Sequence, residues 1–178
     1  MKIKSVILLA ILVTFGGCDW IRSLGEVELD TDLTVNVPVT SVGKKSAETV
    51  SALQDVSFTG SAVLSLDEND DISPYLEKLR EINLQTVTVT INGLVPGQTI
   101  TNVSLSVTGV GTICTQTNIT SANSTFNPQI DAAKLQQAGE KLKDDLSITI
   151  TVSGTSTSPI ANIVNIIFGA RVTAGALD

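Results

Sequence analysis

The chain of 178 residues contains no histidine. Ser-His-Asp and Cys-His catalytic sets use histidine as their general base, so neither set can be built from these residues. Zinc sites ligated by histidine are excluded for the same reason. Carboxylate-pair glycosidases and Ser-Lys hydrolases survive this test, but no recognisable constellation of residues matches either class. The missing histidines therefore favour a protein that is not an enzyme.

Aromatic residues make up only 3% of the chain. Binding sites for sugars commonly combine an aromatic surface with a few polar groups. The single tryptophan, Trp20, lies close to the N-terminus, and the single tyrosine is Tyr75. Glycan binding is therefore an alternative that the aromatic residues do not support.

Basic residues are also few, with 11 Lys and Arg against 18 Asp and Glu and a formal net charge of -7. An acidic surface is repelled by nucleic acid and by anionic lipid head groups. We therefore expect no nucleic-acid partner, and no attachment to a membrane through a basic patch.

The N-terminus has the composition of a signal peptide. Lys2 and Lys4 provide a basic start, and the apolar run Val6–Phe15 is followed by the small residues Gly16 and Gly17. This order is typical of an export signal. The run is shorter than the roughly 20 residues that cross a bilayer core, which disfavours a retained transmembrane helix.

The residues Phe15-Gly16-Gly17-Cys18 resemble the lipobox of bacterial lipoproteins, although Phe15 stands where a leucine is usual. The resemblance implies a signal peptide over residues 1–17, an acylated Cys18 carrying a lipid such as palmitate, and a tether over residues 18–25. Removal of Lys2 and Lys4 with the signal takes the formal net charge from -7 to -9. The alternative is an ordinary secretory signal with Cys18 as a free thiol.

A lipidated Cys18 with two or more acyl chains would be a lasting membrane anchor. The implied location is the bacterial cell envelope, and we expect the outer membrane. Asp19 resembles an inner-membrane retention mark of some Gram-negative bacteria, so the inner membrane stays open as an alternative. The expected partners are the membrane, through the lipid, and another envelope protein.

Residues 26–178 have the length of one domain, and their main pattern is an alternation of apolar and polar residues. It predicts strands at 33–39, 58–66, 86–91, 103–108, 148–152 and 164–172. Pro38 indicates a sheet edge or a strand end. Because such alternation is typical of antiparallel sheets with one solvated face, the pattern predicts a mainly β fold. We expect an antiparallel β-sandwich, immunoglobulin-like in general architecture, with two short helices.

The first helix is predicted to begin at Ser73-Pro74, with serine as N-cap, and to end near Ile82. The second is predicted to open at Asn127-Pro128 and to carry Leu135, Ala138 and Leu142 at helical spacing. Gly139 is expected to weaken this second helix by about 1 kcal/mol relative to alanine. The stretch Gly43–Asp55 is expected to be a loop or a short helix.

Asp67, Asn69 and Asp71 have the alternate spacing of the first ligands of a calcium loop, and calcium prefers oxygen ligands of this kind. An EF-hand needs glycine where Ile72 stands and glutamate where Lys78 stands. The competing interpretation is a solvated turn ahead of the first helix. Calcium is the only metal that the sequence suggests, and no other cofactor is expected.

Cys114 has no residue beside it that would stabilise a thiolate, so a buried, unreactive side chain is the favoured interpretation. The leading hypothesis is a non-enzymatic, lipid-anchored envelope protein that serves as a structural or protein-binding module. The first alternative is a fimbrial or adhesin-type subunit in which the strand Val27–Val39 completes a neighbour's sheet. A hydrolase using carboxylates, with Asp67 and Asp71 as its best site, and a calcium- or glycan-binding module are less favoured.

Overall fold

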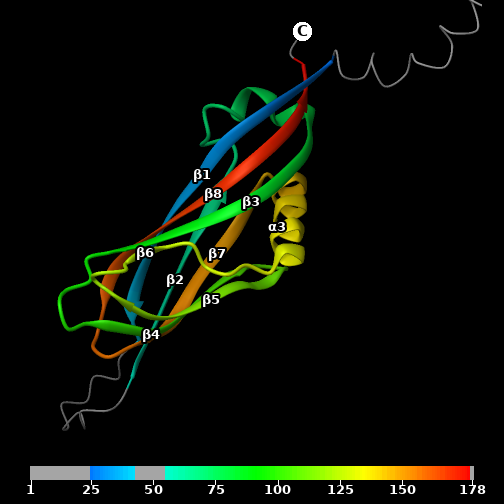
Figure 1. The fold of residues 1–178 in the computed structure, drawn as a ribbon. Helices are drawn as coiled ribbons and strands as arrows, with labels where there is room; N and C mark the ends of the chain where they lie inside the picture. Colours follow the sequence, from blue (N-terminus) through cyan, green and yellow to red (C-terminus); the bar gives the residue numbers. More distant parts are fainter. Residues whose placement is uncertain (1–24, 43–54, 177–178) are drawn as a thin grey trace, which may run out of the picture.

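The computed structural model describes residues 25–42 and 55–176 (Figure 1). The predicted signal peptide, Cys18, most of the tether and nearly all of the Gly43–Asp55 stretch lie outside the described residues. The elements, in chain order, are β1 (Glu26–Ser41), β2 (Val56–Ser65), the 3₁₀ helix η1 (Ser73–Lys78), β3 (Leu79–Asn92), β4 (Thr99–Val107), β5 (Gly111–Thr120), β6 (Thr125–Phe126), α3 (Ala132–Asp145), β7 (Ser147–Ser156) and β8 (Ala161–Gly175).

The strands form one antiparallel sheet in the order β5-β4-β7-β2-β1-β8-β3-β6. The sheet curls into two halves, because β1 pairs with β2 only at Thr40 and Ser41. The first half-sheet is β5-β4-β7-β2 and the second is β1-β8-β3-β6. Their inner faces meet in one hydrophobic core, which contains Phe58 and Val152 from the first half and Ile166 and Phe168 from the second. The predicted antiparallel, mainly β architecture with two helices is confirmed.

Pro38 lies on the side of β1 that faces β2. The N–H of Ser41 donates to the carbonyl of Ile160, on the side of β8. Because N–H groups alternate in direction along a strand, the nitrogen of Pro38 points toward β2. The ladder between β1 and β2 includes only Thr40 and Ser41, so residue 38 has no paired residue on that side. The missing N–H of Pro38 therefore costs no ladder hydrogen bond, although β1 lies inside the sheet, between β2 and β8.

The first helix is shorter than predicted. It is a 3₁₀ helix that ends at Lys78, so the prediction of an end near Ile82 is wrong. From Leu79 onward the chain is strand β3, and Leu79 pairs with Ala174 of β8. The long ladder with β8 provides backbone hydrogen-bond partners for the residues from Leu79 to Asn92, which another helical turn would not do.

The second helix begins later than predicted. Asn127-Pro128 is not its start, because α3 begins at Ala132 and Asp131 is its N-cap. The Oδ1 of Asp131 accepts the N–H groups of Ala133 at 3.1 Å and Lys134 at 3.3 Å. The segment before it is extended, since Ile130 forms a β-bridge with Cys114 of β5. Helix α3 then covers the open side of the sandwich between β3 and β7 (Figure 1).

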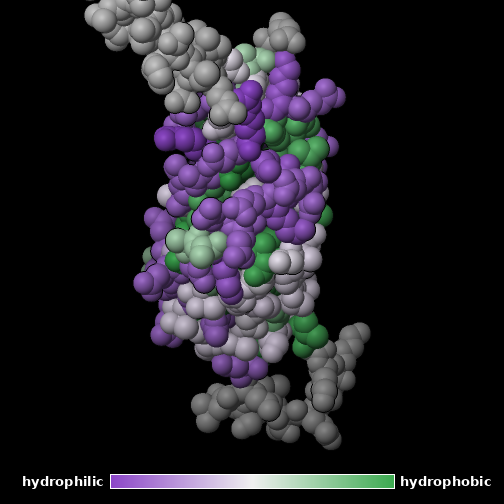
Figure 2. All heavy atoms as spheres, turned by 90° about the vertical axis from the view of Figure 1, so that its right-hand side faces the viewer, coloured by the Kyte–Doolittle hydropathy of each residue, from purple (hydrophilic) through white to green (hydrophobic). Residues whose placement is uncertain are grey.

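Both ends of the described chain lie at one end of the sandwich (Figure 1), where the N–H of Ala176 donates to the carbonyl of Gly25 at 2.8 Å. The β3–β4 and β7–β8 connections lie at the opposite end. Figure 2 shows strongly hydrophilic side chains around α3 and above it, and paler side chains over the lower part of this side. No helix within residues 25–42 and 55–176 is long and apolar enough to span a membrane.

Candidate functional site

The segment Leu66–Ile72, which carries the predicted calcium ligands, connects β2 to η1 and lies against β1. Its two end residues are completely buried, with 0% exposure for both Leu66 and Ile72. Between them, the Nδ2 of Asn69 donates to the carbonyl of Asp32 on β1 at 3.4 Å. Two apolar anchors and a contact to β1 therefore position this acidic segment.

Each of the three predicted calcium ligands has a separate partner. Asp67 accepts a hydrogen bond from the hydroxyl of Ser65. The Oδ1 of Asn69 accepts the backbone N–H groups of Asp71 at 3.0 Å and Ile72 at 3.1 Å, which forms a turn closed by the asparagine side chain. Asp71 accepts from the hydroxyl of Thr31 at 3.0 Å.

These bonds fit the competing interpretation of a solvated turn. Within the described part of the chain, no group of three or more His, Cys, Asp or Glu side chains is arranged to hold a metal ion. Calcium binding by Asp67, Asn69 and Asp71 stays a prediction. Titrating calcium chloride against the melting temperature of the protein would test it, with magnesium chloride as the control.

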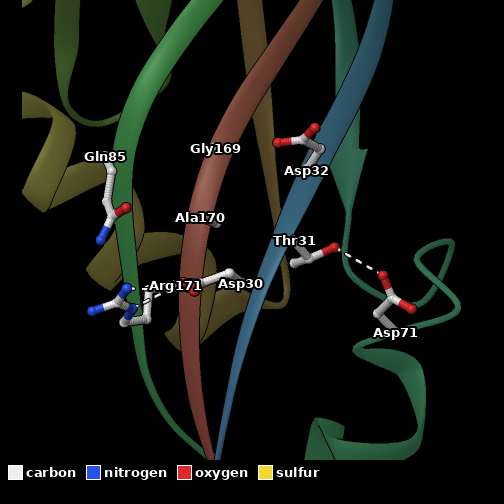
Figure 3. A pocket seen from close by; sticks show the side chains of 8 residues that line it. All are labelled: Asp30, Thr31, Asp32, Asp71, Gln85, Gly169, Ala170 and Arg171. Carbon is white, nitrogen blue, oxygen red and sulfur yellow. Dashed lines mark hydrogen bonds and ion pairs between the residues drawn. The ribbon is translucent and has the colours of Figure 1, made fainter.

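A shallow hollow of about 450 Å³ lies on the outer face of the second half-sheet, beside this segment (Figure 3). Side chains from β1, β3 and β8 and from the segment surround it: Asp30, Thr31, Asp32, Asp71, Gln85, Gly169, Ala170 and Arg171. Sequence reasoning did not find this site. The alternate acidic residues at the start of β1 were the available signal, but the opposite strand that completes the hollow is about 140 residues away in the chain.

Asp30 and Arg171 face each other across β1 and β8 in this hollow (Figure 3). The Nε of Arg171 lies 2.9 Å from Oδ1 of Asp30, and its Nη2 lies 3.4 Å from Oδ2. This hydrogen bonding holds the pKa of the Asp30 carboxyl below its ordinary value and raises the pKa of Arg171. Both side chains are largely exposed, so water screens the pair and it contributes little to stability.

Asp30→Asn is expected to lower the melting temperature slightly at neutral pH. The folded-state pKa of Asp30 lies below its unfolded-state value, so the pair stabilises the fold above the unfolded-state pKa. This contribution is lost as the pH falls through the folded-state pKa. Thermal melts from pH 7 to pH 2 should show the difference between wild type and variant disappearing, whereas Glu28→Gln should show a smaller difference throughout.

The chemistry available in the hollow is that of an exposed polar surface. The carboxylate of Asp32 makes no hydrogen bond or ion pair with the residues that the structure describes, and Asp30 is already paired with Arg171. The residues that line this hollow include no aromatic side chain against which a sugar could stack, so the hollow adds no support to the carboxylate-hydrolase and glycan-binding alternatives. Both alternatives stay predictions.

Cys114 is a buried residue of β5, as predicted, with 8% exposure. Burial raises the pKa of its thiol to about 11, while a backbone hydrogen bond at Leu105 acts in the opposite direction. The apolar gap beside it, between Val89, Leu105 and Val152, has a volume of only about 10 Å³. A desolvated, protonated thiol with no room for a substrate is a poor nucleophile.

We expect Cys114 to resist thiol reagents in the folded protein. In a chain without residues 1–17 and with Cys18→Ser, Ellman's reagent at pH 8 should label Cys114 only slowly in buffer and completely in 6 M guanidinium chloride, since unfolding restores an ordinary pKa and exposure. Stoichiometric labelling within seconds in buffer would contradict the buried position.

The strand Val27–Val39, which the adhesin alternative assigns to a neighbouring subunit, pairs along its whole length with β8 of its own chain. The register runs from Glu26 opposite Gly175 to Thr40 opposite Ala161. Donation of this strand would require the complete ladder with β8 to open first. Strand donation between copies stays a prediction, and the structure adds this cost to it.

No protein-family model matches the chain, and no curated protein matches it. The solved structures to which it is similar include one from Desmodium yellow mottle tymovirus, with 14% sequence identity and a TM-score of 0.36. That similarity covers 85% of this chain and 91% of the other. A likeness at this level assigns no function.

Proposed function

We propose that this chain is a non-enzymatic lipoprotein of the bacterial cell envelope, and that its β-sandwich serves as a structural or protein-binding module on a lipid anchor. The observation that carries the proposal is the sequence Phe15-Gly16-Gly17-Cys18 after a basic start and a short apolar run. The absence of histidine from the whole chain supports a role without catalysis.

The position of Gly25 is compatible with this proposal. Seven residues, Asp19–Gly25, separate Cys18 from the first strand, and a fully extended segment of that length reaches at most about 25 Å. An anchor at Cys18 would therefore keep the Gly25 end of the sandwich near the membrane. The opposite end, with the β3–β4 and β7–β8 connections, would point away from it (Figure 1).

The chain has two cysteines, which provide a matched pair of variants for the anchor. With the full chain expressed in a bacterium and grown with an alkyne analogue of palmitate, we expect Cys18→Ala to abolish labelling and to move the protein from the membrane fraction to the soluble fraction. The physical reason is that the acyl chains would be attached to Cys18, and a chain with a net charge of -7 is not attracted to anionic head groups.

Cys114→Ala is the control, because it removes the other thiol and leaves the signal sequence intact. It should keep both the label and the membrane location, with a modest loss of stability from a smaller buried side chain. If Cys18→Ala stays labelled and membrane-bound, or if wild type takes up no label, the lipid-anchor proposal is wrong.

A further inference from the structure

The strands of the first half-sheet, β2, β4, β5 and β7, contain no Asp, Glu, Lys or Arg at any position. The charge closest to their outer face is at its end, where the carboxylate of Asp55, just before β2, accepts a hydrogen bond from the hydroxyl of Thr101 at 3.0 Å. The charged residues in the described part of the chain lie on the second half-sheet, on η1 and α3, and in the connecting segments. We call the outer face of β5-β4-β7-β2 the neutral face. It is an unusual surface for a chain with a net charge of -7, because acidic proteins normally spread their charges over solvated faces.

Apart from Val63 near the end of β2, which is 58% exposed, the neutral face is an ordered array of hydroxyl and amide groups. In its central row, Thr59 of β2 stands opposite Ser153 of β7, then Ser104 of β4 and Thr115 of β5. The rows on either side, which begin at Ser57 and Ser61, are also made only of Ser, Thr and Asn.

Neighbouring strands hold several of these hydroxyl groups in place. The hydroxyl of Ser61 lies 3.0 Å from that of Thr151, and the hydroxyl of Ser106 lies 3.1 Å from that of Thr112. A surface whose groups are already oriented loses less side-chain entropy when another surface covers it.

We propose that the neutral face is the surface on which a second copy of this chain docks. A hydroxyl group can both donate and accept a hydrogen bond, so an array of hydroxyl groups is complementary to an identical array across a two-fold axis. The outer face of the second half-sheet is less suited to meeting its own copy. Glu28 and Asp32 of β1 lie there beside the ion pairs Glu26–Arg80 and Asp30–Arg171, and covering these charges with an identical surface would add desolvation and like-charge repulsion.

The area of the neutral face predicts a weak, reversible pair. Four strands about 4.8 Å apart and about ten residues long, at about 3.3 Å per residue, cover roughly 600 Å². A stable interface buries about 800 Å² on each partner, and the neutral face has no aromatic residue to act as an anchor. Most copies would therefore be paired only where something else holds them close together.

The arrangement of the strands allows such confinement. β2 and β7 run along the length of the sandwich, with Gly25 at one end (Figure 1). A two-fold axis along that length would leave the Gly25 ends of both copies on the same side, so two anchors could enter one membrane. This last step depends on the proposed lipid anchor, which would raise the effective concentration of the copies. The docking itself does not depend on the anchor.

Disulfide cross-linking through introduced cysteines tests the proposal. Ser104→Cys places a thiol near the centre of the neutral face, and Asn165→Cys places one on the outer face of the second half-sheet, where both native side chains are partly exposed. Under mild oxidation, we expect Ser104→Cys to form the covalent dimer at least about tenfold faster than Asn165→Cys, a ratio equivalent to about 1.4 kcal/mol. Adding Ser153→Glu to the Ser104→Cys chain should remove that advantage, with folding checked by circular dichroism.

The measurement is made twice, on the full chain in cells and on a soluble chain without residues 1–17 and with Cys18→Ser. Equal rates for the two cysteines in both preparations would overturn the proposal, as would capture of a different envelope protein by Ser104→Cys in place of a second copy. If the soluble chain cross-links through Ser104→Cys but the full chain takes up no lipid, the anchor proposal fails and the docking proposal stands. If the full chain takes up lipid but cross-links no faster through Ser104→Cys than through Asn165→Cys, the anchor proposal stands and the docking proposal fails.

Discussion

Gly154→Val is expected to lower the free energy of unfolding by about 3 kcal/mol or more, at the upper end of the cost of overpacking. A Cβ atom at Gly154 would lie 2.1 Å from the carbonyl oxygen of Asn102 and 2.7 Å from the ring of Phe58. The first of these is backbone of the adjacent strand β4, and the second is a core side chain with 2% exposure. Neither can move away without opening the ladder or the core.

The direction of this effect is opposite to the strand preference of the two residues, because valine normally favours a strand over glycine. For a chain of this size, each kcal/mol lost should lower the melting temperature by about 2–4 °C. Urea unfolding followed by circular dichroism measures the loss directly. Ser153→Val is the control: it introduces the same side chain one residue earlier, on the outer face, and should change stability by less than about 0.5 kcal/mol.

A Gly154→Val protein as stable as the wild type would mean that β4 and β7 are not packed as closely as the structure has them. A large loss of unfolding free energy in Ser153→Val would instead indicate that any valine in β7 destabilises the protein. The loss in Gly154→Val could then not be attributed to the close approach of β4 and Phe58. The two variants therefore separate the general effect of a valine in β7 from the specific effect of a side chain at position 154.

Gly139→Ala is expected to destabilise the protein by about 1–3 kcal/mol, the usual cost of overpacking, although alanine is the better helix former. A Cβ atom at Gly139 would lie 2.4 Å from the carbonyl oxygen of Ile82 in β3. Helix α3 would have to move away from the sheet, and the buried contacts of Leu135, Ala138 and Leu142 would loosen with it.

The matched control for Gly139→Ala is Gln137→Ala, an exposed position of the same helix, where only helix propensity changes and the effect should be a few tenths of a kcal/mol. Thermal melts of both variants provide the comparison. If Gly139→Ala raises the melting temperature, the intrinsic preference for alanine dominates and the helix has room to shift.

The expectation that Gly139 weakens α3 was correct about the isolated helix and incomplete about the protein. Propensity compares residues in a helix surrounded by water, whereas Gly139 is buried against the backbone of β3. Nothing in the residues near position 139 announces that a carbonyl of residue 82 will lie there. Only the packing of α3 on the sheet makes the glycine necessary.

Strand β5 shows why one strand escaped prediction. Its apolar residues do not alternate, because Ile113 and Cys114 are both buried and the register with β4 shifts beside them. Further along, Asn118 has a φ of 56°, a left-handed conformation, and it is skipped in the pairing with β4. An irregular strand loses the period of two, and with it the signal by which a sequence reveals a strand.

The sequence predicted the regular strands and the antiparallel β class, because a half-buried strand must alternate apolar and polar residues along its own length. It also predicted the burial of Cys114, which has no charged residue beside it in the chain. The tertiary structure alone decided where α3 begins, which glycines are indispensable, and that Asp30 meets Arg171. It also brought the uncharged strands together into one neutral face. These features join residues that are far apart in the chain, and a local pattern contains no information about which distant strand becomes its neighbour.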